Sequence, residues 1–146
     1  MKNQSLSKMV SVIKKKLFFY IGNNEALVNY VHVSDVVNAL YLCATHQNAV
    51  NGTYIVSQCA SLKDMVEAFS KGINVAPPRL RVPEIIAKPI TKVFGRWPGF
   101  PLTEDRLTAL TRSCQYDSSL ICNELGFSFQ KPLAHAFENY ARSIQK

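Results

Sequence analysis

The chain of 146 residues is long enough for one domain that buries about two-thirds of its unfolded surface, and its 47% apolar content argues against a disordered protein. No stretch approaches the ~18 uninterrupted apolar residues of a membrane helix, and no cleavage site follows an apolar run near the N-terminus, so we expect a cytoplasmic protein without membrane contact. The net charge is +7, but Lys14-Lys15-Lys16 is the only basic run and lacks interleaved aromatic residues, which argues against nucleic acid as a partner.

The first predicted element is an amphipathic helix that ends at the lysine run. Its apolar residues recur at helical spacing through Leu6, Met9, Val10, Ile13 and Leu17. The lysines then lie at the negative end of the helix dipole, as a solvated helix end. A short strand is expected over residues 17–21, and Gly22 ends it.

Residues 29–37 carry the most informative pattern of the chain. Tyr30, Val31 and Val33 favour a strand, while Ser34-Asp35 is typical of a helix start with an acid in the first turn. The helix should continue to about His46, because apolar residues keep one face through Val36, Val37, Leu40, Tyr41 and Ala44. A turn at Asn51-Gly52 and a second strand over 53–57 are predicted next.

Further elements follow towards the C-terminus. Ser61 begins a helix that Gly72 closes, and residues 79–83 are predicted as an edge strand that exposes its arginines. Helices are expected over about 84–94 and 103–110, with a surface loop over 95–101 between them. Two more are predicted over 117–125 and 133–144. The cysteines form no C-x-x-C pair, so we expect free thiols and no metal site at Cys43, Cys59, Cys114 and Cys122.

The order of these motifs resembles the C-terminal part of extended short-chain dehydrogenases/reductases, the NAD-dependent epimerase/dehydratase family. That family has a Y/F-V/I-H-V-x-D-V segment, a helix, a strand like Y-N-V-S, and a Y-D-x-S-K...ELGF ending. The counterparts here lie at 30–36, 54–57 and 116–127. The resemblance implies an α/β fold: a few short strands with about six helices, in which residues 1–146 form a single substrate-binding lobe and the Rossmann nucleotide-binding half is absent.

Two features of the intact family have no counterpart in this sequence. The six glycines form no Gly-rich turn of the kind that holds a dinucleotide pyrophosphate at a helix start. No tyrosine has a lysine four positions later, so the family's proton-transfer pair is absent. We therefore expect no catalytic residue and no bound cofactor in this chain alone, although the resemblance implies NAD(P) for the intact enzymes.

The resemblance implies the substrate-binding portion of an NAD-dependent nucleotide-sugar epimerase or dehydratase. Its ligand would be a nucleotide sugar, and its partner a complementary nucleotide-binding half or a second copy. Candidate substrate contacts are Tyr30 and His32, which lie two apart on the predicted strand, with Trp97 in the loop and Arg112 for a phosphate. Val28 and Leu120 replace an arginine and a lysine of the family pattern, which removes positive charge from this region.

Two other functions remain open, and so do structural roles for the candidate residues. A lobe of a steroid- or flavonoid-type ketone reductase would share the same segments but have an apolar cleft. A non-catalytic interaction module, or the remnant of a truncated gene, would expose apolar edges to a partner. Tyr30 and His32 would then serve packing, and Asp35 and Asp117 would be helix-start acids.

Overall fold

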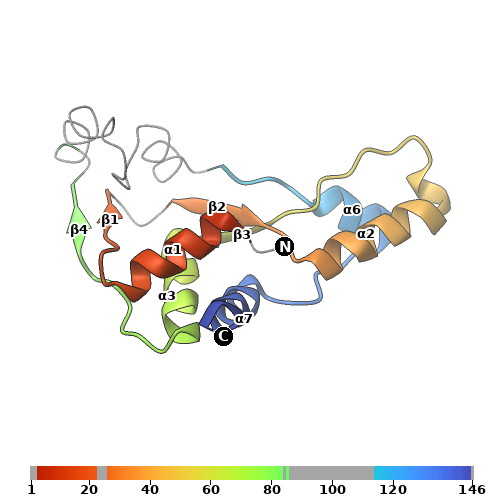
Figure 1. Cartoon of the computed structure of the whole chain (residues 1–146). Helices are drawn as coiled ribbons and strands as arrows, with labels where there is room; N and C mark the ends of the chain where they lie inside the picture. Colours follow the sequence, from red (N-terminus) through yellow and green to blue (C-terminus); the bar gives the residue numbers. More distant parts are fainter. Residues whose placement is uncertain (1–2, 23–25, 84, 86–113, 146) are drawn as a thin grey trace.

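The computed structural model describes residues 3–22, 26–83, 85 and 114–145. Its elements are, in chain order, α1 (Gln4–Lys14), β1 (Tyr20–Ile21), β2 (Leu27–Tyr30), α2 (Val33–Thr45), the 3-10 helix η1 (Gln47–Ala49), β3 (Gln58–Ser61), α3 (Leu62–Gly72), β4 (Arg81–Val82), α6 (Ser119–Leu125) and α7 (Leu133–Gln145). The molecule is elongated, with α1, α3 and α7 at one end and α2 and α6 at the other (Figure 1). The predicted helices over 84–94 and 103–110 and the loop over 95–101 lie outside the described residues.

The strands form two small sheets. β2 pairs with β3 in antiparallel fashion, with Tyr30 opposite Gln58, and β1 pairs with β4 in parallel, with Tyr20 opposite Arg81. The part of the chain that the structure describes therefore has a mixed α/β fold without a complete Rossmann sheet. β1 and β4 lie within their predicted ranges, and both Arg79 and Arg81 are exposed as expected.

The strand predicted over 53–57 is wrong, because the strand lies at Gln58–Ser61 instead. Strand formation requires a neighbour for its backbone groups, and β2 supplies one only to residues 58–61. Residues 53–57 have suitable side chains for a strand, but no described strand lies beside them. Sequence pattern alone could not identify which stretch has the neighbour.

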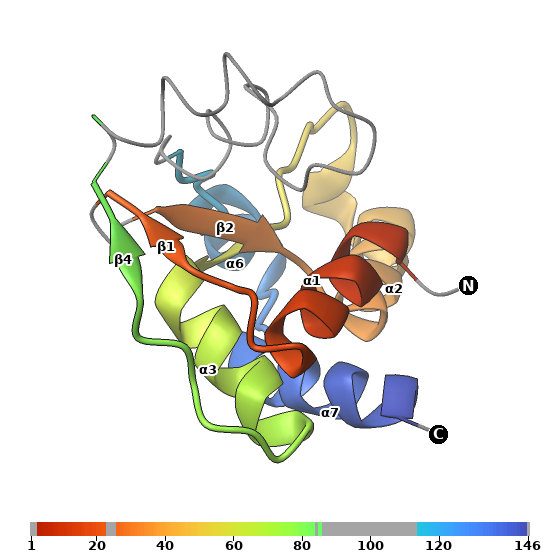
Figure 2. The same ribbon diagram turned by 60° about the vertical axis from the view of Figure 1, so that its left-hand side comes forward.

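The main core lies where α1, α3 and α7 meet (Figure 2). α1 buries Leu6, Val10 and Ile13, which follows from the helical spacing of its sequence. In the centre of this core, the ring of Phe69 in α3 meets that of Phe137 in α7 edge-on, with 5.3 Å between ring centroids. The lysine run lies exposed at the end of α1, as predicted.

α3 and α7 approach most closely at Gly72. A Cβ atom at this position would lie 2.5 Å from the carbonyl oxygen of Glu138 and 2.8 Å from Cβ of Ala141. Only glycine therefore fits between the two helices at their present separation. Beside this contact, Lys71 Nζ lies 3.1 Å from Glu138 Oε2, and Arg142 also pairs with Glu138.

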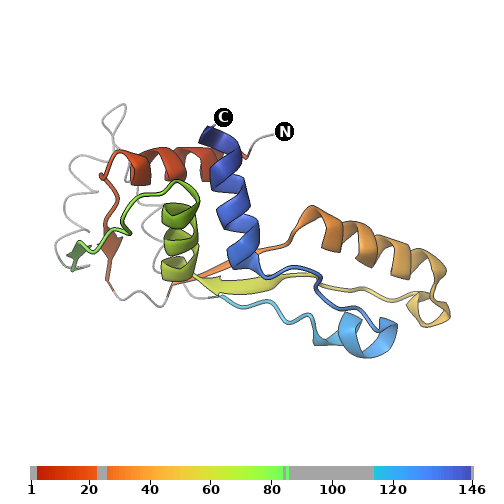
Figure 3. The ribbon, with the colours of Figure 1, turned by 90° about the horizontal axis from the view of Figure 1, so that it is seen from below.

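A smaller core joins α2 and α6 at the far end of the molecule. Ala39 of α2 packs with Ile121 and Leu125 of α6 and with Phe127 behind it. The chain that leads from η1 to β3 runs alongside both helices (Figure 3). It is attached by Tyr54, whose hydroxyl donates to Glu124 Oε2 at 2.8 Å.

The helix starts follow the predictions in one case and differ in another. Ser61 caps α3, because its Oγ accepts a hydrogen bond from the Asp64 N–H at 3.0 Å. In α2, Asp35 lies in the first turn as predicted, but the cap is His32 in place of Ser34, and His32 Nδ1 accepts a hydrogen bond from the Ser34 N–H at 3.2 Å. The imidazole nitrogen replaces the usual hydroxyl or carboxylate oxygen, so the helix begins earlier than the residue types indicate.

Candidate functional site

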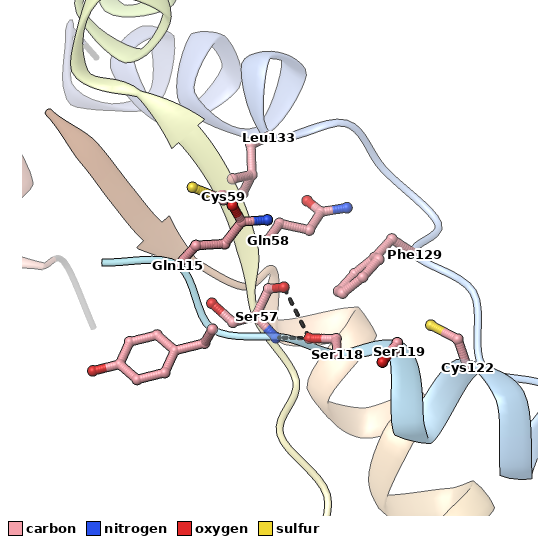
Figure 4. Close-up of a pocket in the computed structure, with 10 residues that line it drawn as sticks. Ser57, Gln58, Cys59, Gln115, Ser118, Ser119, Cys122, Phe129 and Leu133 are labelled. Carbon is pink, nitrogen blue, oxygen red and sulfur yellow. Dashed lines mark hydrogen bonds between the residues drawn. The ribbon is translucent and has the colours of Figure 1, made fainter. Parts of the chain in front are cut away.

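A pocket of about 480 Å³ lies where β3, the segment before α6 and the start of α7 meet. Figure 4 looks into it, with Leu133 on its upper side, Phe129 on one flank and the serine residues below. Its lining is mixed, with polar and aromatic or aliphatic residues: Ser57, Gln58, Cys59, Gln115, Tyr116, Ser118, Ser119, Cys122, Phe129 and Leu133. The volume of this pocket falls within the range of small-molecule sites.

Two serines fix the lower wall of the pocket. Ser118 Oγ accepts a hydrogen bond from the Ser57 N–H at 2.9 Å and donates one to the Ser57 carbonyl at 3.0 Å. Asp117 next to it accepts from the Ser119 N–H at 2.8 Å and from Ser119 Oγ at 2.7 Å. These two hydrogen bonds hold the pKa of the Asp117 carboxyl below its usual range. Asp117 therefore acts at the start of α6, and the Ser118 hydroxyl is engaged by the backbone of Ser57.

Gln58 has an unsatisfied polar atom on the side of β3 that lines this pocket. Its Oε1 is buried and accepts no hydrogen bond within the described part of the chain. A buried amide oxygen without a donor is unfavourable by about 1–3 kcal/mol, so a donor from a bound molecule would relieve it. Gln115 lines the same pocket from the segment before α6 (Figure 4).

Among the described residues that line this pocket, none has a charged side chain. Phosphate groups are normally held by arginine, lysine or free helix N-terminal amides. The described lining therefore offers hydrogen-bonding groups to a ring with hydroxyl groups, with Phe129 and Leu133 against its apolar face.

Tyr30 lies at the edge of this site. It stands opposite Gln58 in the β2–β3 register, and directly opposed residues share one face of a sheet. Its ring meets Phe137 edge-on at 5.4 Å, and burial raises the pKa of its phenol. Tyr30 thus packs on the main core, one cross-strand position from the pocket.

The remaining candidate residues are placed differently. His32 does not share the strand with Tyr30, because β2 ends at Tyr30 and His32 is the cap of α2. The expectation that Tyr30 and His32 lie on one face of a single strand is therefore wrong. The site predictions for Trp97 and Arg112 lie outside the described residues.

Sequence reasoning missed the pocket residues Gln58, Gln115 and Ser118. The predicted strand ends at residue 57, one residue before Gln58, so the sequence does not predict the pairing of Gln58 with Tyr30. The only available signal was the Y-D-S-S segment, which contains Ser118 but was interpreted as a helix start. Pairing between distant segments, not local pattern, creates this pocket.

The starts of α2 and α3 do not fit the pyrophosphate of a dinucleotide. The pyrophosphate of NAD binds free N–H groups at a Gly-rich helix start. Here a side chain already occupies those amides at both strand-to-helix junctions: His32 at α2 and Ser61 at α3. These two helix starts therefore have no free amides to offer to a pyrophosphate.

The cysteines, the possible metal ligands and the helix lengths of the described residues were each compared with what such sites require. All four cysteines are free thiols. Across residues 3–22, 26–83, 85 and 114–145, no three histidine, cysteine or acidic side chains gather as they would around a metal ion. None of the described helices combines the length and the apolar character required to cross a bilayer.

Three solved structures share this fold. "Crystal structure of gox2253" matches with a TM-score of 0.66 at 21% identity, over 98% of this chain and 44% of that one. The UDP-glucuronic acid 4-epimerase from Bacillus cereus in complex with NAD matches with a TM-score of 0.61 at 11% identity, over 98% and 40%. RMD from Pseudomonas aeruginosa complexed with NADPH matches with a TM-score of 0.53 at 14% identity, over 96% and 39%.

These matches show that the chain has the fold of one part of three larger proteins, two of which were solved with NAD or NADPH. The chain spans less than half the length of each solved structure. No protein-family model matches the sequence, and no curated protein matches it significantly. At 11–21% identity these matches show a shared fold.

Proposed function

We propose that residues 1–146 form the substrate-binding lobe of an NAD-dependent nucleotide-sugar epimerase or dehydratase. The observation that carries this proposal is the match of 98% of the chain to 40% of a UDP-glucuronic acid 4-epimerase in complex with NAD. The Y-V-H-V-S-D-V segment of the sequence supports the same assignment.

In such an enzyme NAD takes a hydride from a sugar ring carbon, and the cofactor is held by a nucleotide-binding half. This chain binds and orients the sugar. Its pocket offers Gln58 and Gln115 to ring hydroxyls, while Phe129 and Leu133 cover the ring face. Tyr30 forms the neighbouring wall. His32, Trp97 and Arg112 stay proposed substrate contacts, with Arg112 for the diphosphate.

Calorimetric titration of the chain with UDP-glucuronic acid tests this proposal. The ligand is expected to bind, and Gln58→Leu should weaken binding by about tenfold, because the sugar loses a hydrogen-bonding partner. Gln4→Leu, in α1 and away from the pocket, is the matched control and should leave affinity unchanged. Equal affinity of the wild-type and Gln58→Leu chains, or no binding at all, would contradict the proposal.

A ketone-reductase lobe is the second candidate. The uncharged lining of the pocket and the presence of Val28 in place of an arginine favour it. A flat apolar ketone such as a steroid would then bind in place of the UDP-sugar. Titration with both compounds separates the two functions, and a chain that binds neither would support the non-catalytic interaction module.

A further inference from the structure

A basic surface lies where β1 and β4 form one edge of the described molecule. The two strands pair in parallel, and the Tyr20 N–H donates to the Leu80 carbonyl at 2.9 Å. This pairing brings together two segments that are distant in sequence: the chain from the end of α1 to β1, and the chain that enters β4 (Figures 1 and 2). Five exposed cations belong to these segments: Lys14, Lys15, Lys16, Arg79 and Arg81.

The two segments contain no acid that could neutralise these cations. Residues 3–22 and 72–83 include no aspartate or glutamate, although the chain has 10 of them. Among the described residues, the salt bridges lie on α3 and α7 and involve none of the five cations. Two acids of α3, Glu67 and Asp64, have charges that reach Tyr20, and Glu67 is paired with Lys63. Positive charge therefore dominates this edge, and it attracts anions over about 8–10 Å at physiological salt.

Two exposed leucines lie among the cations. Leu17 directly follows the lysine run and is 66% exposed, and Leu80 lies between the two arginines and is 65% exposed. Aliphatic side chains surrounded by lysine and arginine are typical of surfaces that lie on an anionic bilayer. A nucleic acid would instead stack its bases on exposed aromatic rings. The neighbouring ring of Phe18 is not free for stacking on both sides, because it meets the buried Tyr20 ring edge-on at 5.3 Å.

We infer that this basic surface docks on an anionic lipid bilayer. The two leucines enter the headgroup region, while the five cations meet the acidic headgroups. The sequence alone predicts no membrane contact, because it has no spanning stretch and the lysine run resembles a solvated helix end. Docking of this kind needs no spanning helix, and the β1–β4 pairing adds Arg79, Leu80 and Arg81 to the run. The surface shares no residue with the sugar pocket, so the inference is independent of the proposed function.

Co-sedimentation of the chain with lipid vesicles tests the inference. Vesicles of phosphatidylcholine with about one third phosphatidylserine should bind the chain at least about tenfold more tightly than pure phosphatidylcholine vesicles, because each cation at an anionic surface contributes about fivefold. The difference should shrink as the salt concentration is raised. Equal binding to both kinds of vesicle, or binding to neither, would overturn the inference.

Charge reversals locate the contact. Lys15→Glu and Arg79→Glu should each weaken binding to the acidic vesicles by about tenfold or more, since each replaces an attraction with a repulsion. Lys131→Glu is the matched control, because it makes the same change in net charge at an exposed residue between α6 and α7. It should weaken binding by less than about twofold, because it lies outside the contact. An equal loss from Lys131→Glu would show that net charge alone attracts the vesicles and would overturn the inference.

The leucines separate a bilayer from a nucleic acid as the partner. Leu80→Ser should weaken binding to the acidic vesicles by about fivefold, because the leucine side chain leaves water when it enters the headgroup region. Leu40→Ser, on α2, is the control, since Leu40 is also 65% exposed, and it should have no effect. Equal vesicle binding by the wild type and Leu80→Ser would contradict the inference. A single-stranded oligonucleotide that binds the chain when the vesicles do not would assign the surface to nucleic acid and overturn it.

Discussion

The carboxylate of Asp35 accepts a hydrogen bond from the backbone N–H of Gln130 at 3.0 Å, although 95 residues separate them in the chain. Asp35 lies in the first turn of α2 and is fully buried, while Gln130 precedes α7. The bond therefore ties the outer end of the molecule, with α2 and α6, to the chain that returns to the main core. Asp35 is more than the helix-start acid that its position in the sequence indicates.

Replacing this carboxylate should destabilise the protein. Asp35→Ala leaves the Gln130 N–H without its partner, and we expect a loss of about 1–3 kcal/mol in the free energy of unfolding. Asp64→Ala is the control, because Asp64 is an exposed acid in the first turn of α3 and its loss should stay within about 0.5 kcal/mol. If urea denaturation gives the same loss in the free energy of unfolding for both variants, Asp35 stabilises the protein only through the helix dipole and not through its bond to Gln130.

How far the sequence predicts this structure depends on the range of the interactions. α1, α3 and α7 follow their predicted bounds closely, because helical periodicity and caps are local properties. The predicted position of β3 is wrong, and the Asp35–Gln130 hydrogen bond is not predicted at all. Both depend on contacts between residues far apart in the chain. The same holds for the pocket, which joins Gln58 to Gln115 across a long separation in sequence.

Gly72→Ala tests the close approach of α3 and α7. Alanine normally favours a helix over glycine by up to about 1 kcal/mol, but here its Cβ would overlap Glu138. We expect a net destabilisation of about 1–3 kcal/mol by chemical denaturation. Lys63→Ala, on the exposed side of α3, should change stability little. A neutral or stabilising effect of Gly72→Ala would mean that the helices lie further apart.

The cap of α2 makes a separate prediction. His32→Ala removes the acceptor for the Ser34 N–H and should lower the free energy of unfolding by about 1 kcal/mol. His32→Asn restores a strong cap and should regain that stability. If the asparagine variant also loses affinity for UDP-glucuronic acid while its stability is normal, the imidazole has the substrate contact proposed for it.

Acid should weaken the α3–α7 contact through Glu138. A hydrogen bond from Lys71 holds the pKa of this carboxyl below its ordinary value of 4.5, with further lowering by the charges of Lys71, Arg142 and His135 against some desolvation. A depressed folded-state pKa means that the stabilisation is complete above pH 4.5 and is lost as the pH falls through the lower value.

Thermal unfolding measured from pH 7 to pH 3 checks this dependence. Glu138→Gln should flatten the decrease between neutral and acidic pH, because the variant has no carboxyl to protonate. Asp117, whose pKa is also lowered, gives a second contribution in the same direction, so Asp117→Asn serves as the comparison. Identical pH profiles for wild type and Glu138→Gln would show that the ion pair adds no stability.

The central claim is that this lobe recognises a sugar substrate and has no site for the dinucleotide. A paired calorimetric titration of the chain alone, once with UDP-glucuronic acid and once with NAD, tests it most directly. The account predicts heat and saturation with the UDP-sugar and none with NAD. Micromolar binding of NAD, with or without the sugar, would contradict it.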